Sequence, residues 1–138
     1  MNYWLVKSEP FKYSWEDFVR DGRTYWDGVR NYQARNNLAA MKAGDLALFY
    51  HSNKGLEIVG VAKVVKESCQ DPTTDDERWV VVDMEPDSVL EHPVGLKDIK
   101  TDPALKEMHI VKQSRLSVTP VLKKHFDILI KKGKNRPL

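Results

Sequence analysis

Strand-forming segments are clustered in this chain, and their order limits the folds that are open to it. Each segment is short and rich in aromatic or β-branched residues, which favour extended backbone. Helical segments fall between them at irregular intervals, whereas a parallel βαβ sheet would alternate the two regularly. We therefore expect an α+β fold, with a mostly antiparallel β pseudo-barrel flanked by short helices. The predicted strands are Tyr3–Lys7, Leu46–His51, Ile58–Lys66, Trp79–Glu85, Pro93–Leu96 and Arg115–Val118.

Capping residues mark the predicted helices. A short helix is expected after Ser14, which suits an N-cap, and Gly22 ends it. A second helix follows Asn31, again a good N-cap, and stops before Gly44. The free N–H groups at its start would favour a nearby anion or carbonyl oxygen. The other helical predictions are a turn at Pro103–Met108 and a final helix from Thr119-Pro120 to Gly133.

Length and composition fit one soluble domain spanning residues 1–138. No apolar run approaches the roughly 20 residues of a membrane span, and the first residues lack the pattern of a signal peptide. Cys69 is the single cysteine, so no internal disulfide and no cysteine zinc motif can form. We expect a reducing, cytoplasmic location, or a nuclear one in a eukaryote, with no membrane partner and a monomeric state.

Positive charge is concentrated at the end of the chain. Segment 112–138 holds eight basic residues against the single acid Asp127, so it carries +7 while the remaining residues carry −5. Such asymmetry is typical of a surface that faces a polyanion, although a solvated lysine-rich helix would give the same pattern. Four lysines of this segment are predicted to contact phosphates, namely Lys123, Lys124, Lys131 and Lys132.

Segment 26–37 has a mixture of side chains that a protein core does not require. Its twelve residues include two aromatics, two arginines, three asparagines and a glutamine. Amide groups bond to the edges of a heterocycle, aromatic rings stack on its face, and arginine offers planar donors. The segment therefore predicts a site for a flat, polar ring such as a nucleobase.

A series of motifs along the whole chain carries a resemblance to a known family. These motifs are Tyr3-Trp4-Leu5, Lys7-Ser8-Glu9-Pro10, Trp26, Gly28–Asn36, Gly44-Asp45, Phe49–Ser52, Ile58-Val59-Gly60, Asp71-Pro72, Trp79, Val82-Asp83 and Arg115–Val118. On these residues the chain resembles the EVE domain family, which has a PUA-like fold. This resemblance implies a five- or six-stranded pseudo-barrel related to the YTH and PUA RNA-binding domains. It also implies a reader of modified bases, including modified cytosines in DNA.

Trp26 is the predicted stacking platform, with core packing as the alternative. Glu9 is predicted to accept a hydrogen bond from an exocyclic amine, and the alternative is an ion pair with an arginine such as Arg30. Tyr50 is expected to complete a sandwich around the base. The full set of predicted base-binding residues is Lys7, Ser8, Glu9, Trp26, Val29, Arg30, Asn31, Asn36, Tyr50, His51, Arg115 and Ser117.

The sequence favours a binding module over an enzyme. Arg30 and Arg35 join the four lysines as predicted phosphate contacts, and the expected partner is DNA or RNA with a modified base. No nucleophile–base pair, phosphate loop or metal-ligand cluster is evident, so we predict no catalytic residue, metal or cofactor. Alternatives are an enzyme or sensor for a free nucleotide-like molecule, with Glu9 or His51 as general base, and a protein-interaction module.

Overall fold

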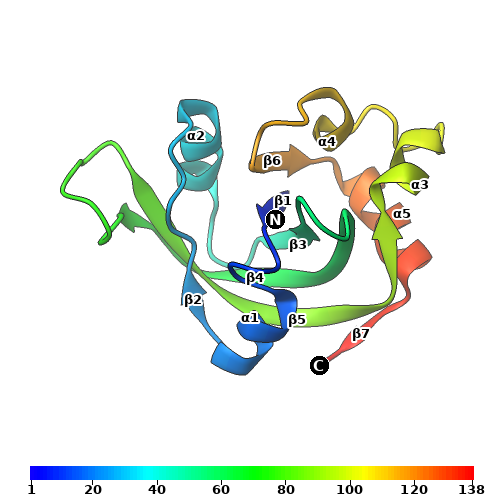
Figure 1. The fold of residues 1–138 in the computed structure, drawn as a ribbon, viewed down its shortest axis with the longest axis horizontal. Coiled ribbons are helices and arrows are strands. Elements are labelled where there is room, and N and C mark those ends of the chain that lie inside the picture. The colour runs from blue at the N-terminus through cyan, green and yellow to red at the C-terminus, as the bar shows by residue number, and fades with distance from the viewer.

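The computed structural model describes residues 1–138 and contains one seven-stranded sheet (Figure 1). Its strands follow the order β2-β5-β4-β3-β1-β6, and β7 pairs with β5. The two ends of this order, β2 and β6, do not pair, so the sheet is not closed. The strands are β1 (Tyr3–Ser8), β2 (Thr24–Tyr25), β3 (Leu46–His51), β4 (Glu57–Gln70), β5 (Val80–Gly95), β6 (Val118–Val121) and β7 (Asn135–Pro137).

Five helices lie against this sheet, and they divide between its two faces. Buried side chains of α1 and α2 belong to one core cluster, and those of the other three helices belong to a second. Figure 1 shows this division, with α2 on one side of the strands and α3, α4 and α5 on the other. The helices are α1 (Trp15–Asp21), α2 (Tyr32–Ala40), α3 (Leu96–Thr101), α4 (His109–Lys112) and α5 (Lys123–Gly133).

Both faces of the central strands are buried, and residues alternate between the two cores. Trp4 and Val6 of β1 pack in the first core, whereas Leu5 between them packs in the second. On β3, Phe49 lies in the first core and Tyr50 in the second. This alternation follows from the two-residue period of a strand, and it decides which site residues can meet.

The sheet is antiparallel except where β1 pairs with β3 in parallel. The expected α+β class and mostly antiparallel strands are therefore confirmed. The helices α1 and α2 and the short β2 occupy the long connection between these two strands, as a parallel pair requires. β1 lies between β3 and β6, so its last residues leave the sheet from a central position.

Several predicted elements differ from the structure. Pro93–Leu96 is not a separate strand, because β5 continues without a break from Val80 to Gly95. Thr119-Pro120 does not begin a helix, because these residues pair with β1 in β6. The predicted strand Arg115–Val118 is therefore shifted, and Pro103–Met108 forms turns rather than a helix. The elements α3, α4, β2 and β7 were not predicted from the sequence.

Gly60 lets α1 approach the sheet closely. A Cβ atom on Gly60 would lie 2.4 Å from carbon atoms of the buried Trp15 ring. We therefore expect Gly60→Ala to lower the free energy of unfolding by about 1–3 kcal/mol, because the ring must shift within a filled core. Urea unfolding midpoints measure this. Gly95→Ala is the control, since the nearest atom would be Asp98 Oδ2 at 3.8 Å; equal losses from both variants would contradict the explanation.

Candidate nucleic-acid interface

Two cavities meet where β1 ends, and Lys7 and Glu9 line both. The first, which we call the Trp26 cavity, has a volume of about 400 Å³. The second, the Tyr50 cavity, has a volume of about 520 Å³. The Trp26 cavity is lined by Lys7, Ser8, Glu9, Lys12, Tyr13, Thr24, Tyr25, Trp26 and Asp27. The Tyr50 cavity adds other predicted residues to Lys7 and Glu9, namely Tyr50, Arg115 and Ser117.

Trp26 takes part in the core and also lines its cavity. The residue is 8% exposed, and its ring meets Phe49 edge to face at a centroid distance of 5.6 Å. Its backbone N–H donates to the Val82 carbonyl at 2.7 Å, which fixes the segment beside β5. The indole is therefore held rigidly, with a small part of its surface at the cavity.

Trp26 and Tyr50 do not form the predicted sandwich. Trp26 belongs to the first core and Tyr50 to the second, so the two rings lie on opposite faces of the sheet. The prediction is wrong because Tyr50 directly follows Phe49, the residue on which Trp26 packs, and neighbouring strand residues point to opposite sides.

Glu9 presents a carboxylate oxygen that few groups in the chain satisfy. Its Oε1 accepts a hydrogen bond from the Asn53 amide. Its Oε2 is shielded from solvent and has no aligned hydrogen-bond donor, although Lys12 Nζ lies 2.9 Å away as an ion-pair partner. The alternative pairing of Glu9 with Arg30 is wrong, because Arg30 bonds to Asp71. The Glu9 carboxylate is thus held by Asn53 and Lys12 where the two cavities meet.

Lys7 and Ser8 are positioned by hydrogen bonds to backbone carbonyls. Lys7 Nζ donates to the Ser114 carbonyl at 2.7 Å, and burial lowers the pKa of its ammonium. The Ser8 hydroxyl donates to the Tyr13 carbonyl at 2.5 Å. The Ser8 oxygen therefore remains available chiefly as an acceptor.

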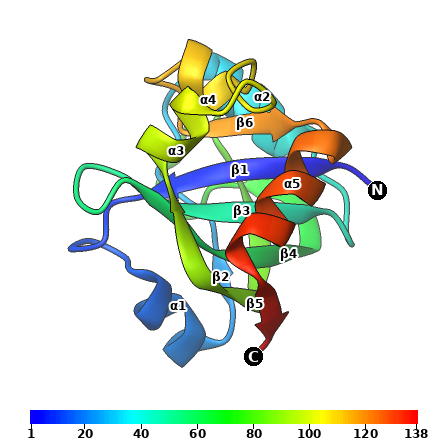
Figure 2. The same cartoon turned by 90° about the vertical axis from the view of Figure 1, so that its right-hand side faces the viewer.

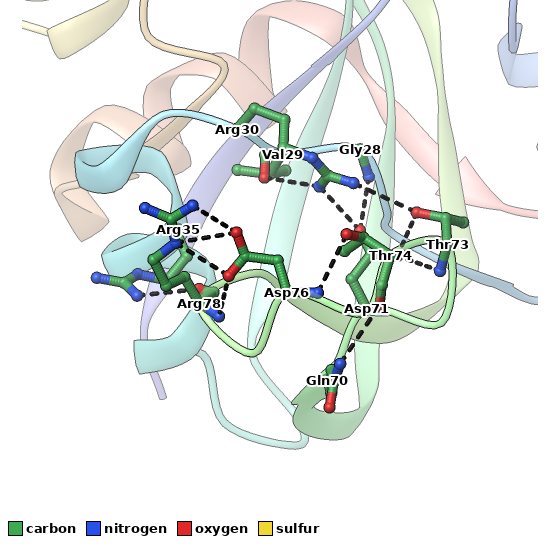
Figure 3. Close-up of polar contacts among 10 residues, drawn as sticks. All are labelled: Gly28, Val29, Arg30, Arg35, Gln70, Asp71, Thr73, Thr74, Asp76 and Arg78. Carbon is green, nitrogen blue, oxygen red and sulfur yellow. Dashed lines mark hydrogen bonds and ion pairs between the residues drawn. The ribbon is translucent and has the colours of Figure 1, made fainter.

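Asp71 anchors the start of the segment that follows Trp26 (Figure 3). This residue is fully buried, and one carboxylate oxygen accepts from Gly28 N–H at 3.1 Å and from Arg30 Nη1 at 3.0 Å. The other oxygen accepts from the Thr73 N–H at 2.7 Å and from the Thr73 hydroxyl at 2.5 Å.

These bonds set the charge state of Asp71. Burial by itself would raise the pKa of this carboxyl, but the bonds from Thr73, Arg30 and Gly28 outweigh it and lower the pKa to about 2. Asp71 is therefore ionised at neutral pH. The sequence does not reveal this role, because two of the donors, Gly28 and Arg30, lie more than 40 residues away in the chain. The local signal was an Asp before Pro72, which is typical of a turn.

Aromatic rings and arginines fasten the loop between β4 and β5 to the start of α2. The rings of Tyr32 and Trp79 lie 5.3 Å apart, and Arg78 donates to the Tyr32 hydroxyl at 2.7 Å. The guanidinium groups of Arg30 and Arg78 lie 5.5 and 5.6 Å from the Trp79 ring. Arg35 Nη1 donates to the Arg78 carbonyl at 2.9 Å. Trp79 is buried and lies under arginine side chains.

A third hollow, of about 400 Å³, lies beside the start of α2 and contains Asn31 and Arg115. It shares Ser114 and Arg115 with the Tyr50 cavity, so the three hollows adjoin through common residues. Asn31 caps α2 by accepting a hydrogen bond from Ala34 N–H at 3.0 Å. Its side chain therefore has a structural role, and its amide N–H₂ remains a possible donor.

Three other predicted base-binding residues make contacts of a structural kind. Val29 is 6% exposed and packs in the first core. The Asn36 side chain is exposed and accepts from Arg35 Nε at 3.0 Å. His51 Nε2 lies 3.1 Å from the Trp15 N–H that donates to it, and burial lowers the pKa of its imidazole.

The α5 lysines lie away from the Trp26 cavity. Figure 2 shows the start of α5 near the first residues of β1, whereas Glu9 follows the last. Phe126 of α5 accordingly packs on Tyr3 at a centroid distance of 4.4 Å. Lys123 pairs with Asp127 at 2.7 Å, and Lys132 pairs with Asp102 at 3.3 Å. The residues predicted to contact phosphates therefore do not lie together on one surface.

No group of three His, Cys, Asp or Glu side chains has the arrangement of a metal site. No helix has the length and apolar character needed to cross a bilayer.

The sequence profile of the EVE domain matches residues 2–132. Thymocyte nuclear protein 1 from Mus musculus is 37% identical over an alignment that covers 99% of this chain and 75% of that protein. A crystal structure of a protein from Agrobacterium tumefaciens superposes with a TM-score of 0.94 at 47% identity, covering 96% of this chain and 93% of the other.

Human THYN1 protein, solved in complex with DNA that contains 5-methylcytosine, has a TM-score of 0.89 at 34% identity and covers 99% of this chain and 100% of its own. A YTH domain from Zygosaccharomyces rouxii has a TM-score of 0.60 at 18% identity, over 95% of this chain and 85% of its own, which shows a shared fold.

Proposed function

The chain belongs to the EVE domain family, and we propose that it binds nucleic acid by taking a modified base into the Trp26 cavity. The observation that carries this proposal is the pairing of a rigid indole with the Glu9 carboxylate in one cavity. The human relative, solved with 5-methylcytosine DNA, supports a cytosine-type base as the first candidate.

Base capture uses the aromatic and acidic sides of this cavity. Trp26, Tyr13 and Tyr25 supply ring surface, and stacking of one base contributes about 1–3 kcal/mol. The Glu9 carboxylate accepts from the exocyclic amine of the base once Lys12, its ion-pair partner, turns to a phosphate. Extrusion of a base from a duplex costs a few kcal/mol, so single strands and weakened pairs are preferred.

The phosphate groups of the bound nucleic acid lie along the hollows that adjoin the Trp26 cavity. They do not lie along α5. Lys12 lines the Trp26 cavity, and Lys112 and Arg115 line the third hollow. Arg30 and Arg35 hold the loop between β4 and β5, and their roles are mainly structural. For duplex DNA, each phosphate that the protein neutralises makes the slope of log K against the logarithm of the salt concentration steeper by about 0.9.

The first test compares oligonucleotides that carry 5-methylcytosine with unmodified ones by fluorescence anisotropy at two salt concentrations. We expect tighter, salt-sensitive binding of the modified strand. Glu9→Gln is expected to weaken that binding by about tenfold or more, because a hydrogen bond to a charged acceptor is lost.

Asp87→Asn is the matched control for Glu9→Gln, since Asp87 is exposed and no side-chain contact holds it. It should leave both affinities unchanged. Weak, salt-insensitive binding of every oligonucleotide would overturn the proposed function. If the two substitutions changed the affinity equally, Glu9 would not be part of the base-binding site.

We propose a binding role without a catalytic step. His51, the histidine considered as a general base, accepts a hydrogen bond from the Trp15 backbone through Nε2 and does not line the Trp26 cavity. A free nucleotide as ligand and a protein partner remain alternatives. Competition by the free modified nucleoside would favour the former, and a protein recovered after nuclease treatment would favour the latter. The cytoplasmic location stays a prediction.

A further inference from the structure

A fourth cavity, of about 450 Å³, lies between β6, α5 and the turn that precedes α4, and we call it the α5 cavity. Its wall is mostly apolar and includes Met108, Val121 and Ile128. Val121 pairs with Tyr3 at the start of β1, so the α5 cavity lies at the opposite end of this strand from Glu9. The proposed capture of a base does not use this cavity.

His125 is a buried polar side chain that the α5 cavity leaves without a partner. The residue is 4% exposed and lines the cavity, yet neither of its ring nitrogens takes part in a hydrogen bond within the chain. Burial and the nearby Lys124 lower the pKa of its imidazole, although Glu107 acts in the opposite direction. A neutral imidazole offers one N–H donor and one acceptor. Glu9 Oε2 is the only polar side-chain atom that is both shielded from solvent and without a hydrogen-bond partner, so the His125 nitrogens reach solvent at the cavity and are open to a ligand.

Charge at the α5 cavity favours an anion. Glu107 bonds to Lys112, so its carboxylate is already neutralised. Lys124 is exposed, lines the cavity and has no ion-pair partner. His109 donates through Nδ1 to the Gln113 amide oxygen at 2.9 Å, which occupies one of its two nitrogens. One free cation beside an apolar wall matches a molecule with a single negative group and an apolar body.

We propose that the α5 cavity binds a small organic monocarboxylate. The carboxylate lies between Lys124 Nζ and the His125 N–H, and the apolar body lies against Met108, Val121 and Ile128. Each contact is of a kind that ligand cavities of this size use, with an apolar lining and a few converging polar groups.

The test is an NMR titration of the full chain with hexanoate, followed by the same titration with 1-hexanol. We expect saturable shifts at the His125 ring and the Ile128 methyl groups, with a dissociation constant on the order of 1 mM. Hexanol is expected to bind at least several-fold more weakly, because it lacks the charge that faces Lys124.

Lys124→Gln is expected to weaken hexanoate binding by about threefold to tenfold while leaving hexanol binding unchanged. Lys123→Gln is the matched control, since Lys123 is the preceding residue, is paired with Asp127 and does not line the cavity. Shifts confined to Trp26 and Ser8, equal affinity for acid and alcohol, or no effect of Lys124→Gln would each overturn the proposal. His125→Phe adds a check, because a ring without nitrogen should reduce the preference for the acid while Lys124 keeps part of it.

Discussion

Asp71→Ala is expected to lower the free energy of unfolding by roughly 2–5 kcal/mol and to abolish selective base binding. The change leaves the N–H groups of Gly28 and Thr73 without their acceptor and Arg30 without its ion-pair partner. Arg30 is 42% exposed and can be resolvated, so most of the cost comes from the two backbone groups. Because Gly28 directly follows the Trp26-Asp27 edge of the cavity, the cavity loses its support as well.

Thermal unfolding measures the first effect, and we expect the melting temperature to fall by about 10 °C. Asp75→Ala is the control, since Asp75 is an exposed acid in the same loop. A loss below 1 kcal/mol for Asp71→Ala would contradict the anchoring role.

The difference in unfolding free energy between the wild type and Asp71→Ala depends on pH. Because the folded-state pKa of Asp71 is about 2, below its ordinary 3.8, its ionised form contributes about 2 kcal/mol above pH 4. This contribution is lost as the pH falls from about 4 to 2, so the wild type and the variant should converge in that range. A difference that stays constant to pH 2 would mean that the carboxylate charge is not involved.

Trp26→Ala is expected to cost about 3–5 kcal/mol of stability, because a large side chain leaves the core beside Phe49. Loss of binding in that variant could therefore reflect loss of the fold. Trp26→Phe keeps an aromatic ring and most of the buried volume. We expect it to remain folded and to bind the modified oligonucleotide about tenfold more weakly, since the stacking surface shrinks.

Trp15→Phe is a matched control for this substitution. Trp15 also meets Phe49 edge to face, at 5.3 Å, but it does not line the Trp26 cavity. The two variants should lose similar stability, and only Trp26→Phe should lose affinity. Equal affinities for the two would assign Trp26 to the core alone.

The sequence predicted features that depend on residues close together in the chain. Ser14 accepts from Asp17 N–H at 3.0 Å, and Asn31 accepts from Ala34 N–H at the same distance, so both N-caps are confirmed. Gly22 ends α1 with a φ of 72°, which favours glycine. The strand Leu46–His51 is also confirmed, because its branched and aromatic residues face two cores.

Features that depend on distant residues could not be found in this way. Thr119 and Pro120 have the pattern of a helix start, but pairing with Leu5 and Trp4 places them in β6, an edge strand where proline is tolerated. Sequence spacing did not reveal that the rings of Trp26 and Tyr50 lie on different faces. The role of Asp71 required knowledge of Gly28, which lies 43 positions earlier.

The central position of β1 has a consequence for biosynthesis. Among the strands of this domain β1 is made first and can pair with β3, but its other partner β6 begins only at Val118, so the sheet stays incomplete until most of the domain has been made. At about 5–20 residues per second, the nascent chain would expose one unpaired edge of β1 for several seconds or more. We expect this interval to make the domain depend on chaperones during translation more than an antiparallel meander of equal length would.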